Sequence, residues 1–415
     1  MSSVDFLDEL LDGVVVEWRA LGEVTLPTNN IKWRDANRTY RYIDLTSVSI
    51  EKKTITETSE ITHSNAPSRA QKLVEKDDVI FATTRPAQQR YCLIDEKYTG
   101  EVASTGYCVL RAKKAEVSPK WILHWIASSD FKTYVEENQS GSAYPAISDA
   151  KVKDFKIPIP CPDNPEKSLE IQAEIIRILD TFTELTAELT AELTARKKQY
   201  NHYRNQLLSF EHGDVEWKTL GDIGEVRMCK RILKNETQPE GDVPFYKIGT
   251  FGKKADAYIS KRIFETYKEK YSFPKEGDVL ISAAGTIGRA VIYDGEPAYF
   301  QDSNIVWLEN DESIVTNRYL WHFYKIAKWA ISEGGTIDRL YNDNIKKTKI
   351  VVPYPHDSEK SLAEQARIVA ILDKFDALTN SISEGLPREI ELRQKQYEHY
   401  RDLLLSFPKP ETVEA

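Results

Sequence analysis

The chain has 415 residues, more than one ordinary domain holds, so we expect two or three domains. Hydrophobic residues make up 41% and charged residues 29%, which is typical of a folded rather than a disordered chain. The net charge of −9 at pH 7 disfavours a uniformly basic nucleic-acid-binding protein. However, the blocks 25–156 and 223–349 each carry 20 Lys and Arg against 17 and 18 Asp and Glu, so the acidic excess lies outside these two mildly basic blocks.

The sequence also disfavours membrane, secreted and zinc-binding proteins. No run approaches the roughly 20 apolar residues that a membrane span needs, and the acidic start lacks the regions of a signal peptide. The four cysteines form no CxxC pair, and the seven histidines show no metal-ligand spacing. We therefore expect a cytoplasmic protein without a metal site.

An N-terminal helix is expected first, and it is followed by a strand at 16–22 that the chain repeats. Val16-Glu-Trp-Arg-Ala-Leu-Gly22 returns as Val215-Glu-Trp-Lys-Thr-Leu-Gly221, and Leu207-Leu-Ser-Phe210 returns as Leu404-Leu-Ser-Phe407. Several such matches in one order indicate an internal duplication. Each copy consists of an opening strand, a variable block, a Pro-rich exit and a long helix.

The two variable blocks show almost no mutual similarity, yet they predict the same order of elements. The predicted strands are 79–82 and 107–111 in the first block and 279–282 and 304–308 in the second, followed by apolar helices at 121–126 and 319–324. We expect Trp121, Trp125, Trp321 and Trp329 to lie in the core. A duplicated frame that carries two different inserts indicates two domains of similar architecture that bind two different targets.

Long helices follow the blocks. Apolar residues from Leu169 to Ser209 recur at spacings of three, four and seven, which predicts one helical stripe, and Ser168 is the expected N-cap. The second helix, 362–406, repeats the stripe, but Gly385 and Pro387 should kink or interrupt it. Because a long apolar stripe needs a partner, we expect the two helices to form an antiparallel coiled coil.

These features together resemble the specificity subunit of type I restriction-modification systems, and most closely its IC-type branch. The resemblance rests on the Val-Glu-Trp opening strand, the exit Ile157-Pro-Ile-Pro-Cys-Pro162, the tandem Thr-Ala-Glu-Leu units at 186–193 and the closing segment 386–397. It is specific over the repeated frame, whereas the variable blocks match only in layout.

The resemblance implies a role. Such a subunit is a DNA-binding protein that reads a split, asymmetric sequence through two target-recognition domains, and it has no catalytic site. Two modification subunits join it to form an adenine methyltransferase, and motor-nuclease subunits add restriction, which serves phage defence. The partners would bind S-adenosylmethionine, ATP and Mg²⁺, so we expect no cofactor on this chain.

The resulting fold expectation is α+β (mixed α/β). Two small α/β target-recognition domains should be joined by two long antiparallel coiled-coil helices in a pseudo-twofold internal repeat. The expected parts are an N-terminal helix and opening strand at 1–24, target-recognition domain 1 at 25–156, a central conserved helical spacer at 157–222, target-recognition domain 2 at 223–349 and a C-terminal conserved helical spacer at 350–415.

Polar loops of the first block are candidate DNA contacts. Arginine pairs bidentately with guanine and glutamine with adenine in the major groove, while hydroxyl groups can bind phosphate or base edges. The alternative reading of each loop is a solvated hairpin or turn. The candidates are Arg85, Gln88, Gln89, Arg90, Ser104, Thr105, Tyr107, Ser142 and Tyr144.

The second block offers a comparable set. Its Gly-rich segment 282–289 lacks the Lys-Ser/Thr ending of a P-loop, so we interpret it as a tight turn that presents side chains to DNA. Its lysines are candidate phosphate contacts, or solvated charge otherwise. The candidates are Lys253, Lys254, Ser282, Thr286, Arg289, Gln301, Asp302, Ser303, Arg339 and Tyr341.

Two other functions stay open at this point. One is a self-contained DNA methyltransferase or nuclease, and the other is a coiled-coil adaptor. Asp44 with Glu51-Lys52-Lys53 fits a nuclease pattern only loosely, and the sequence shows no methyltransferase motif, Walker sequence or convincing triad. An adaptor would explain the helices but not the two divergent blocks. We therefore expect a non-catalytic DNA reader.

Overall fold

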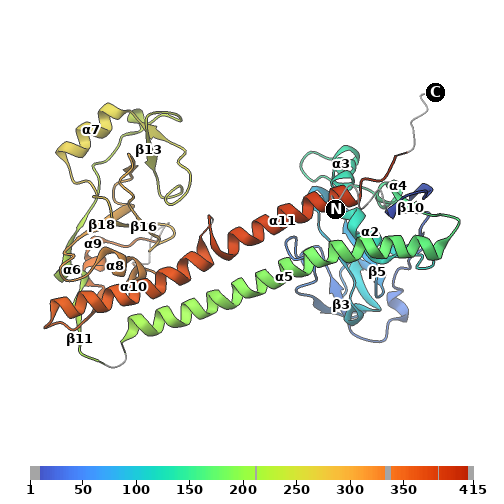
Figure 1. Cartoon of the computed structure of the whole chain (residues 1–415), viewed down its shortest axis with the longest axis horizontal. Helices are drawn as coiled ribbons and strands as arrows, with labels where there is room; N and C mark the ends of the chain where they lie inside the picture. Colours follow the sequence, from blue (N-terminus) through green and yellow to red (C-terminus); the bar gives the residue numbers. More distant parts are fainter. Residues whose placement is uncertain (1–9, 211–212, 332–337, 382, 410–415) are drawn as a thin grey trace. The chain divides into compact units, whose positions relative to one another are not determined.

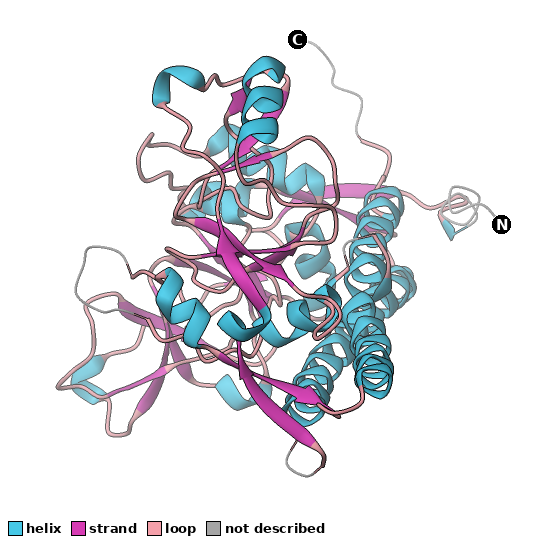
Figure 2. Cartoon of the chain, turned by 90° about the vertical axis from the view of Figure 1, so that its left-hand side faces the viewer, coloured by secondary structure: helices cyan, strands magenta, loops and turns pink. Residues whose placement is uncertain are grey.

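The computed structural model describes residues 10–210, 213–331, 338–381 and 383–409. The chain divides into two compact units, of which unit 1 contains Met1–Leu189 and Ile390–Ala415 and unit 2 contains Thr190–Glu389. Unit 1 therefore combines the first block with the far end of the chain. Helices and short strands both contribute to the units (Figure 2), and the fold is mixed α/β as predicted. The finer division into five parts stays a prediction.

Two small sheets form the first block in unit 1. One has the order β2-β9-β6-β7 with antiparallel neighbours, and the other has the order β4-β3-β8-β5 with β3 parallel to β8. The strands are β2 Thr25–Leu26, β3 Tyr40–Ile43, β4 Ser59–Ile61, β5 Ala70–Val74, β6 Val79–Ala82, β7 Tyr91–Leu93, β8 Glu101–Ser104 and β9 Tyr107–Ala112. The predicted strands at 79–82 and 107–111 are confirmed.

Unit 2 repeats this arrangement with different residues. Its sheets have the orders β12-β18-β15-β16 and β14-β13-β17, and β13 is parallel to β17. The strands are β12 Gly224–Arg227, β13 Val243–Tyr246, β14 Tyr258–Ile259, β15 Val279–Ser282, β16 Ala290–Ile292, β17 Tyr299–Phe300 and β18 Ile305–Asn310. The two blocks therefore share the strand order of the first sheet and the parallel pair of the second, although the described second sheet of unit 2 has three strands and lacks a counterpart of β5. The predicted strands near 279–282 and 304–308 are confirmed.

Each block is closed by a two-stranded ribbon made from its opening strand and its Pro-rich exit. In unit 1, β1 Val16–Ala20 pairs antiparallel with β10 Lys156–Pro160. In unit 2, β11 Val215–Thr219 pairs in the same way with β19 Lys349–Pro353. Proline is tolerated here because every strand of a two-stranded ribbon has a free edge.

Short helices cover the sheets. They are α2 Pro119–Ile126, α3 Ser129–Asn138 and α4 Asp149–Asp154 in unit 1, and α6 Leu220–Ile223, α7 Lys261–Lys270, α8 Asn317–Tyr324 and α9 Asn342–Lys347 in unit 2, with 3-10 turns η1 Trp33–Asp35, η2 Pro86–Gln88, η3 Glu96–Tyr98 and η4 Lys234–Glu236. The predicted helices near 121–126 and 319–324 are confirmed. Trp121 and Trp125 are buried as expected, whereas Trp321 and Trp329 are only partly buried at the core of unit 2.

The long helices are α5 Pro165–Ser209, α10 Ser358–Asn380 and α11 Gly385–Leu404. The predicted interruption of the second helix is confirmed at Gly385, whose φ of +75° favours glycine and where an added Cβ would lie 2.5 Å from the Ala377 oxygen. The predicted N-cap Ser168 is wrong. Asn164 accepts a hydrogen bond from the Lys167 N–H at 3.1 Å, and Pro165 starts the helix one turn earlier.

The long helices pack against each other within each unit. In unit 1, α5 and α11 run side by side in opposite directions (Figure 1), and the rings of Phe182 and Tyr400 stack at 5.3 Å. In unit 2, Tyr203 of α5 stacks on Phe375 of α10 at 5.6 Å. These aromatic pairs lie on the apolar stripe that the sequence predicted.

The same polar contacts fasten each block to its long helix. The side-chain oxygen of buried Gln172 accepts from the Ser118 N–H at 2.9 Å, and Gln365 accepts from the Thr316 N–H at the same distance. His124 meets Asp180 at 3.1 Å, and His322 meets Asp373 at 2.7 Å. Each block is thus held on its helix by hydrogen bonds between buried or half-buried groups, which fix an orientation more strictly than apolar contact does.

Candidate nucleic-acid interface

Three candidate loops of the first block meet at one end of strand β6. The turn that follows β6 is bonded to the loop before α4, because the Arg85 N–H donates to the Pro145 oxygen at 2.7 Å and the Ile147 N–H donates to the Thr83 oxygen at 2.9 Å. The Thr83 N–H also donates to the Gly106 oxygen at 2.8 Å. The predicted segments around 85–90, 104–107 and 142–144 are therefore neighbours in space.

Unit 2 brings its own three loops together in the same way. The Leu340 N–H donates to the Ala283 oxygen at 2.8 Å, and the Ala283 N–H donates to the Asn304 oxygen at 2.7 Å. Ala284 also forms a β-bridge with Arg339. The predicted segments around 282–289, 301–304 and 339–341 thus occupy the positions that their counterparts hold in unit 1. In both units, the other two loops are hydrogen-bonded to the turn that follows β6 or β15.

Several candidates of unit 1 present their side chains to solvent. Arg85, Gln88 and Ser142 are exposed, Thr105 and Gln89 are half-buried, and the ring of Tyr144 is 71% exposed. The Arg85 guanidinium lies 5.4 Å from the centre of the Tyr144 ring. Exposed planar and amide groups on loops that hydrogen bonds hold in place suit contact with base edges.

The exposed candidates of unit 2 are chemically different. Thr286, Ser303, Arg339 and Tyr341 are exposed, as are Lys253 and Lys254 in the loop after β13. Gln301 is half-buried, and its oxygen accepts from the Ile248 N–H at 3.1 Å. Asp302 forms an ion pair with Arg231 at 2.8 Å. The two units therefore offer different side chains from equivalent positions.

Three candidates do not fit direct contact with DNA because they are buried. Ser104 accepts from the Gly106 N–H at 3.2 Å, and the Tyr107 hydroxyl donates to the Asp44 oxygen at 3.0 Å. Burial raises the pKa of Tyr107. Ser282 accepts from the Arg289 N–H at 3.0 Å and donates to the Thr286 oxygen. These side chains shape the turns from inside, a role that the sequence motif could not distinguish from exposure.

Arg90 and Arg289 occupy equivalent positions just before β7 and β16. The guanidinium of Arg289 donates to the Phe251 oxygen at 2.8 Å, and that of Arg90 donates to the Val48 oxygen. Both acceptors lie in the loop after the parallel strand, β13 or β3. In each unit, the arginine therefore links the loop after the parallel strand to the turn after β6 or β15. The sequence had suggested base contacts for both arginines.

Lys53 is a member of this region that sequence reasoning did not select. Its ammonium donates to the Gln89 oxygen and lies 4.4 Å from the centre of the Tyr91 ring. Burial, together with the nearby charge of Arg90, lowers its pKa to about 8. A Lys-Lys pair in a loop gave no sign of this packing, which depends on the turn 85–90 folding over it.

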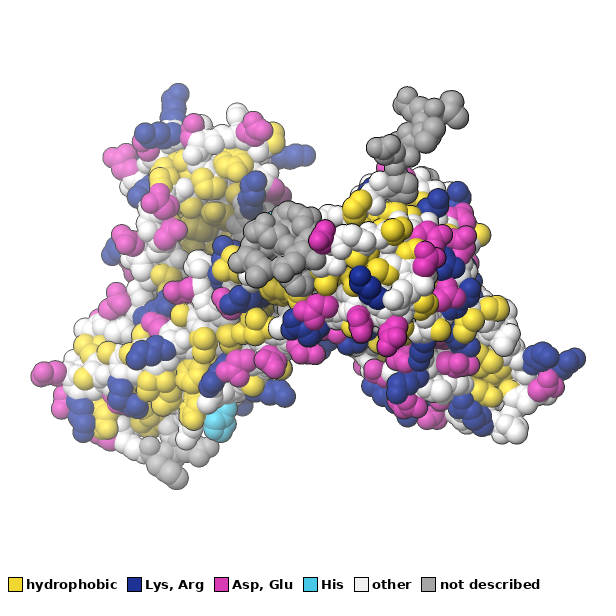
Figure 3. Space-filling view, turned by 45° about the vertical axis from the view of Figure 1, so that its right-hand side comes forward, with side chains coloured by type: hydrophobic (Ala, Val, Ile, Leu, Met, Phe, Trp, Pro, Cys, Tyr) yellow, Lys and Arg dark blue, Asp and Glu magenta, His cyan; other side chains and the backbone are white. Residues whose placement is uncertain are grey.

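The face of the molecule in Figure 3 carries no large patch of basic side chains alone. On the face that Figure 3 shows, Lys and Arg side chains are interspersed with Asp and Glu. Recognition at such a surface depends on individual placed cations more than on a long-range positive potential. The described residues contain no group of three or more His, Cys, Asp or Glu side chains that could hold a metal ion, and none of their helices is long and apolar enough to cross a membrane.

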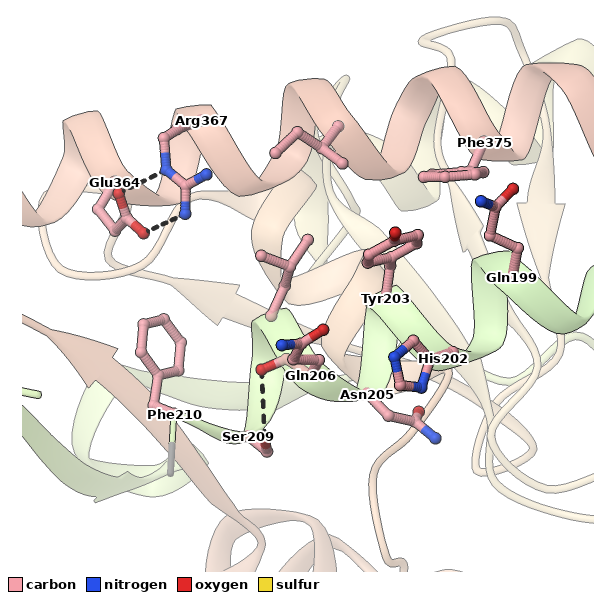
Figure 4. Close-up of a pocket in the computed structure, with 12 residues that line it drawn as sticks. Gln199, His202, Tyr203, Asn205, Gln206, Ser209, Phe210, Glu364, Arg367 and Phe375 are labelled. Atoms are coloured by element: carbon pink, nitrogen blue, oxygen red, sulfur yellow. Dashed lines mark hydrogen bonds and ion pairs between the residues drawn. The ribbon is translucent and has the colours of Figure 1, made fainter. Parts of the chain in front are cut away.

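A second surface feature of unit 2 is an open groove of about 1180 Å³ between the end of α5 and the start of α10. Figure 4 shows Tyr203, Phe210 and Phe375 among its lining side chains. Polar groups join them, including the ion pair of Arg367 with Glu364 at 2.7 Å. The groove lies on the repeated frame rather than on the loops described above.

Comparison with known proteins agrees with this arrangement. The family model described as the type I restriction modification DNA specificity domain matches residues 18–196 and again residues 213–392. A protein of Haemophilus influenzae that is assigned as a type I restriction enzyme specificity subunit is 45% identical, with 97% of this chain and 98% of that protein covered. The EcoR124I/EcoR124II specificity subunit of Escherichia coli is 38% identical over the full length of both.

A solved structure from a type I restriction-modification system shares the fold. It has a TM-score of 0.64 and 22% identity, and the match covers 94% of this chain and 97% of the other. Assignment to the IC-type branch stays a prediction. The two family-model matches and the two close relatives together show that this chain belongs to the type I restriction-modification specificity subunits.

Proposed function

We propose that this chain reads a bipartite, asymmetric DNA sequence, with one half-site for each recognition block. The observation that carries the proposal is that two blocks of similar topology present different side chains from equivalent loops. A common scaffold keeps the loops in place, while Arg85 and Gln88 in one block and Thr286 and Arg339 in the other would select different bases. Family membership favours this reading over a self-contained enzyme or a coiled-coil adaptor.

The chemistry would reside in partner subunits. Two modification subunits would bind S-adenosylmethionine and methylate adenine, and motor-nuclease subunits with ATP and Mg²⁺ would join through the complex in the cytoplasm. The repeated frame is the natural docking region because it occurs twice, and the unit 2 groove offers aromatic and charged groups for one such contact. Exposed His202 and Gln206 on its rim provide a test, since changing both to Glu should reduce co-purification with the modification subunit.

Selection from a pool of random duplexes tests the reading role. The full chain with its modification subunit should enrich a bipartite sequence, and the lone chain should transfer no methyl group. Exchange of 25–156 for the block of a relative should alter one half-site and leave the other intact. Methyl transfer by the lone chain, or a swap that alters both half-sites, would contradict the proposal.

A further inference from the structure

The turn after β6 carries an arginine at each end, and the two make different contacts. The guanidinium of Arg90 is used within the protein, because it donates to the Val48 oxygen. The exposed guanidinium of Arg85 has no hydrogen bond or ion pair to the residues that the structure describes, and its neighbour there is the ring of Tyr144 at 5.4 Å. Arg85 therefore keeps its donors available for a ligand.

The backbone of Arg85 is nevertheless held firmly. Its N–H donates to the Pro145 oxygen at 2.7 Å, and buried Pro86 follows it as the first residue of η2. Its φ of +51° lies in the left-handed region that a residue with a side chain adopts only when its surroundings impose it. The position of the Cα is thus fixed, while the head group points into solvent.

Tyr144 is presented in a similar way. Its loop is closed by two reciprocal backbone hydrogen bonds of 2.8 Å between Ser140 and Ala146. Gly141 has a φ of +93°, and an added Cβ there would lie 3.0 Å from the Tyr144 oxygen, so the loop is tight. The ring is 71% exposed although the loop that carries it is bonded at its base. A large aromatic group kept in solvent by a tight loop is well placed to contact a ligand or to support a neighbouring side chain.

The hydrogen-bonding groups of Arg85 suit the major-groove edge of guanine. The planar fork of arginine donates two hydrogen bonds to O6 and N7 of guanine, and this is the commonest specific contact in the major groove. A guanidinium that lies against an aromatic ring gains a cation–π contact and a restricted plane. An aromatic neighbour thus lowers the entropy that Arg85 loses when it binds a base edge.

We propose that Arg85 reads one guanine of the first half-site and that Tyr144 is a positioning residue that holds the guanidinium for this contact. The inference rests on the proposed function, since it names the base that one recognition surface selects. Arg90 serves as the structural counterpart, as Arg289 does in unit 2, because each holds a loop through a backbone oxygen.

The test uses the full chain with its modification subunit and a duplex pool randomised at both half-sites. Arg85→Ala should remove the preference for guanine at one position, with discrimination reduced roughly 5- to 150-fold. Arg85→Lys should restore it only in part, because an ammonium lacks the fork. Tyr144→Ala should relax the same position to a smaller extent, and Tyr144→Phe, which keeps the ring, should retain the preference.

Arg90→Ala is the matched control. It should weaken binding to all sequences, because it loosens the loop without removing a base contact, and the second half-site serves as an internal reference. A uniform loss of affinity with Arg85→Ala would identify a phosphate contact and overturn the inference, as would relaxation at an A·T position. If the wild type selects no bipartite sequence, the proposed function fails. If the wild type selects one and Arg85→Ala leaves it unchanged, only this inference fails.

Discussion

Units 1 and 2 perform the same structural tasks with different residues in the blocks and the same residues in the frame. The ring nitrogen of Trp121 donates to the Pro158 oxygen at 3.0 Å, and the Tyr319 hydroxyl donates to the Val351 oxygen at 3.1 Å. By contrast, the fastening residues on the long helices are glutamine and aspartate in both units. Identical chemistry is therefore retained where a block meets its helix, and the loops can vary because that junction does not depend on them.

The units differ in how their cores are completed. Leu405 and Phe407 from the end of the chain join the core of unit 1, and the Trp18 ring nitrogen donates to the Pro408 oxygen at 2.7 Å. In unit 2, the matching residues Leu208 and Phe210 come from α5 and the residue that follows it. The repeated segment that completes the core is therefore far in sequence from the first block in unit 1. In unit 2, it directly precedes the second block in the sequence.

The largest expected effect comes from Phe407→Ala. The side chain is 4% exposed, and its ring lies 5.6 Å from Trp121 and 6.4 Å from Trp125. Removal of such a buried ring should reduce the free energy of unfolding of unit 1 by about 3–5 kcal/mol. Hydrogen exchange of backbone amides in β1 and β11 would report the two units separately.

Phe210→Ala is the matched variant in unit 2. Phe210 is only partly buried, so its loss should be smaller and should appear in β11 rather than β1. Faster exchange in β11 after Phe407→Ala, at the same level as in β1, would show that the end of the chain does not belong to unit 1 alone.

The next prediction concerns how the stability of unit 2 depends on pH. The side chain of His322 is fully buried, and burial lowers its pKa to about 4. An unfolded histidine has a pKa near 6.5, so the folded state binds fewer protons between these values. Stability is retained above about pH 6.5 and falls as the pH drops towards 4, with a loss on the order of 2 kcal/mol by pH 5.

Denaturant unfolding of unit 2 between pH 7 and pH 5 measures this effect. In His322→Gln the amide does not titrate in this range, so the variant should start less stable and show a flatter pH dependence. An equally steep dependence in the variant would assign the acid sensitivity to other groups.

The frame was predictable because its signals are local. Spacings of three and four residues predicted the long helices, and Gly385 predicted the break between α10 and α11. The N-cap prediction was wrong at Ser168 because that hydroxyl accepts from Gln172 Nε2 at 3.1 Å inside the helix, while Asn164 and Pro165 supply the start. The sequence thus identified the element but not the choice between two competing caps.

The candidate surfaces were predictable in their location but not in the role of each residue. The loops around 85–90 and 142–144 were named separately, and the structure brings them together. Sequence gives the type of a residue but not its partner, so Arg85 and Arg90 looked alike. Arg90 is distinguished by the Val48 oxygen, 42 positions away in the chain. Contacts at such separations depend on the tertiary fold and leave no local pattern.

The smallest expected effect separates two lysines in corresponding loops. Lys253 is exposed in the loop whose Phe251 oxygen meets Arg289, whereas Lys53 is half-buried in the loop whose Val48 oxygen meets Arg90. If Lys253 contacts a phosphate, Lys253→Ala should weaken binding equally for all sequences and lower the slope of log affinity against log salt by about 0.9. Lys53→Ala should instead loosen the turn through the lost bond to the Gln89 oxygen, and should weaken binding, as Arg90→Ala does, with little change in salt slope. Titrations of both variants at several salt concentrations, on the selected duplex and on an unrelated one, measure the two quantities. An unchanged slope for Lys253→Ala would show that Lys253 does not contact a DNA phosphate. The loop that carries Lys253 would then differ from the loop that carries Lys53 only in how its lysine is packed.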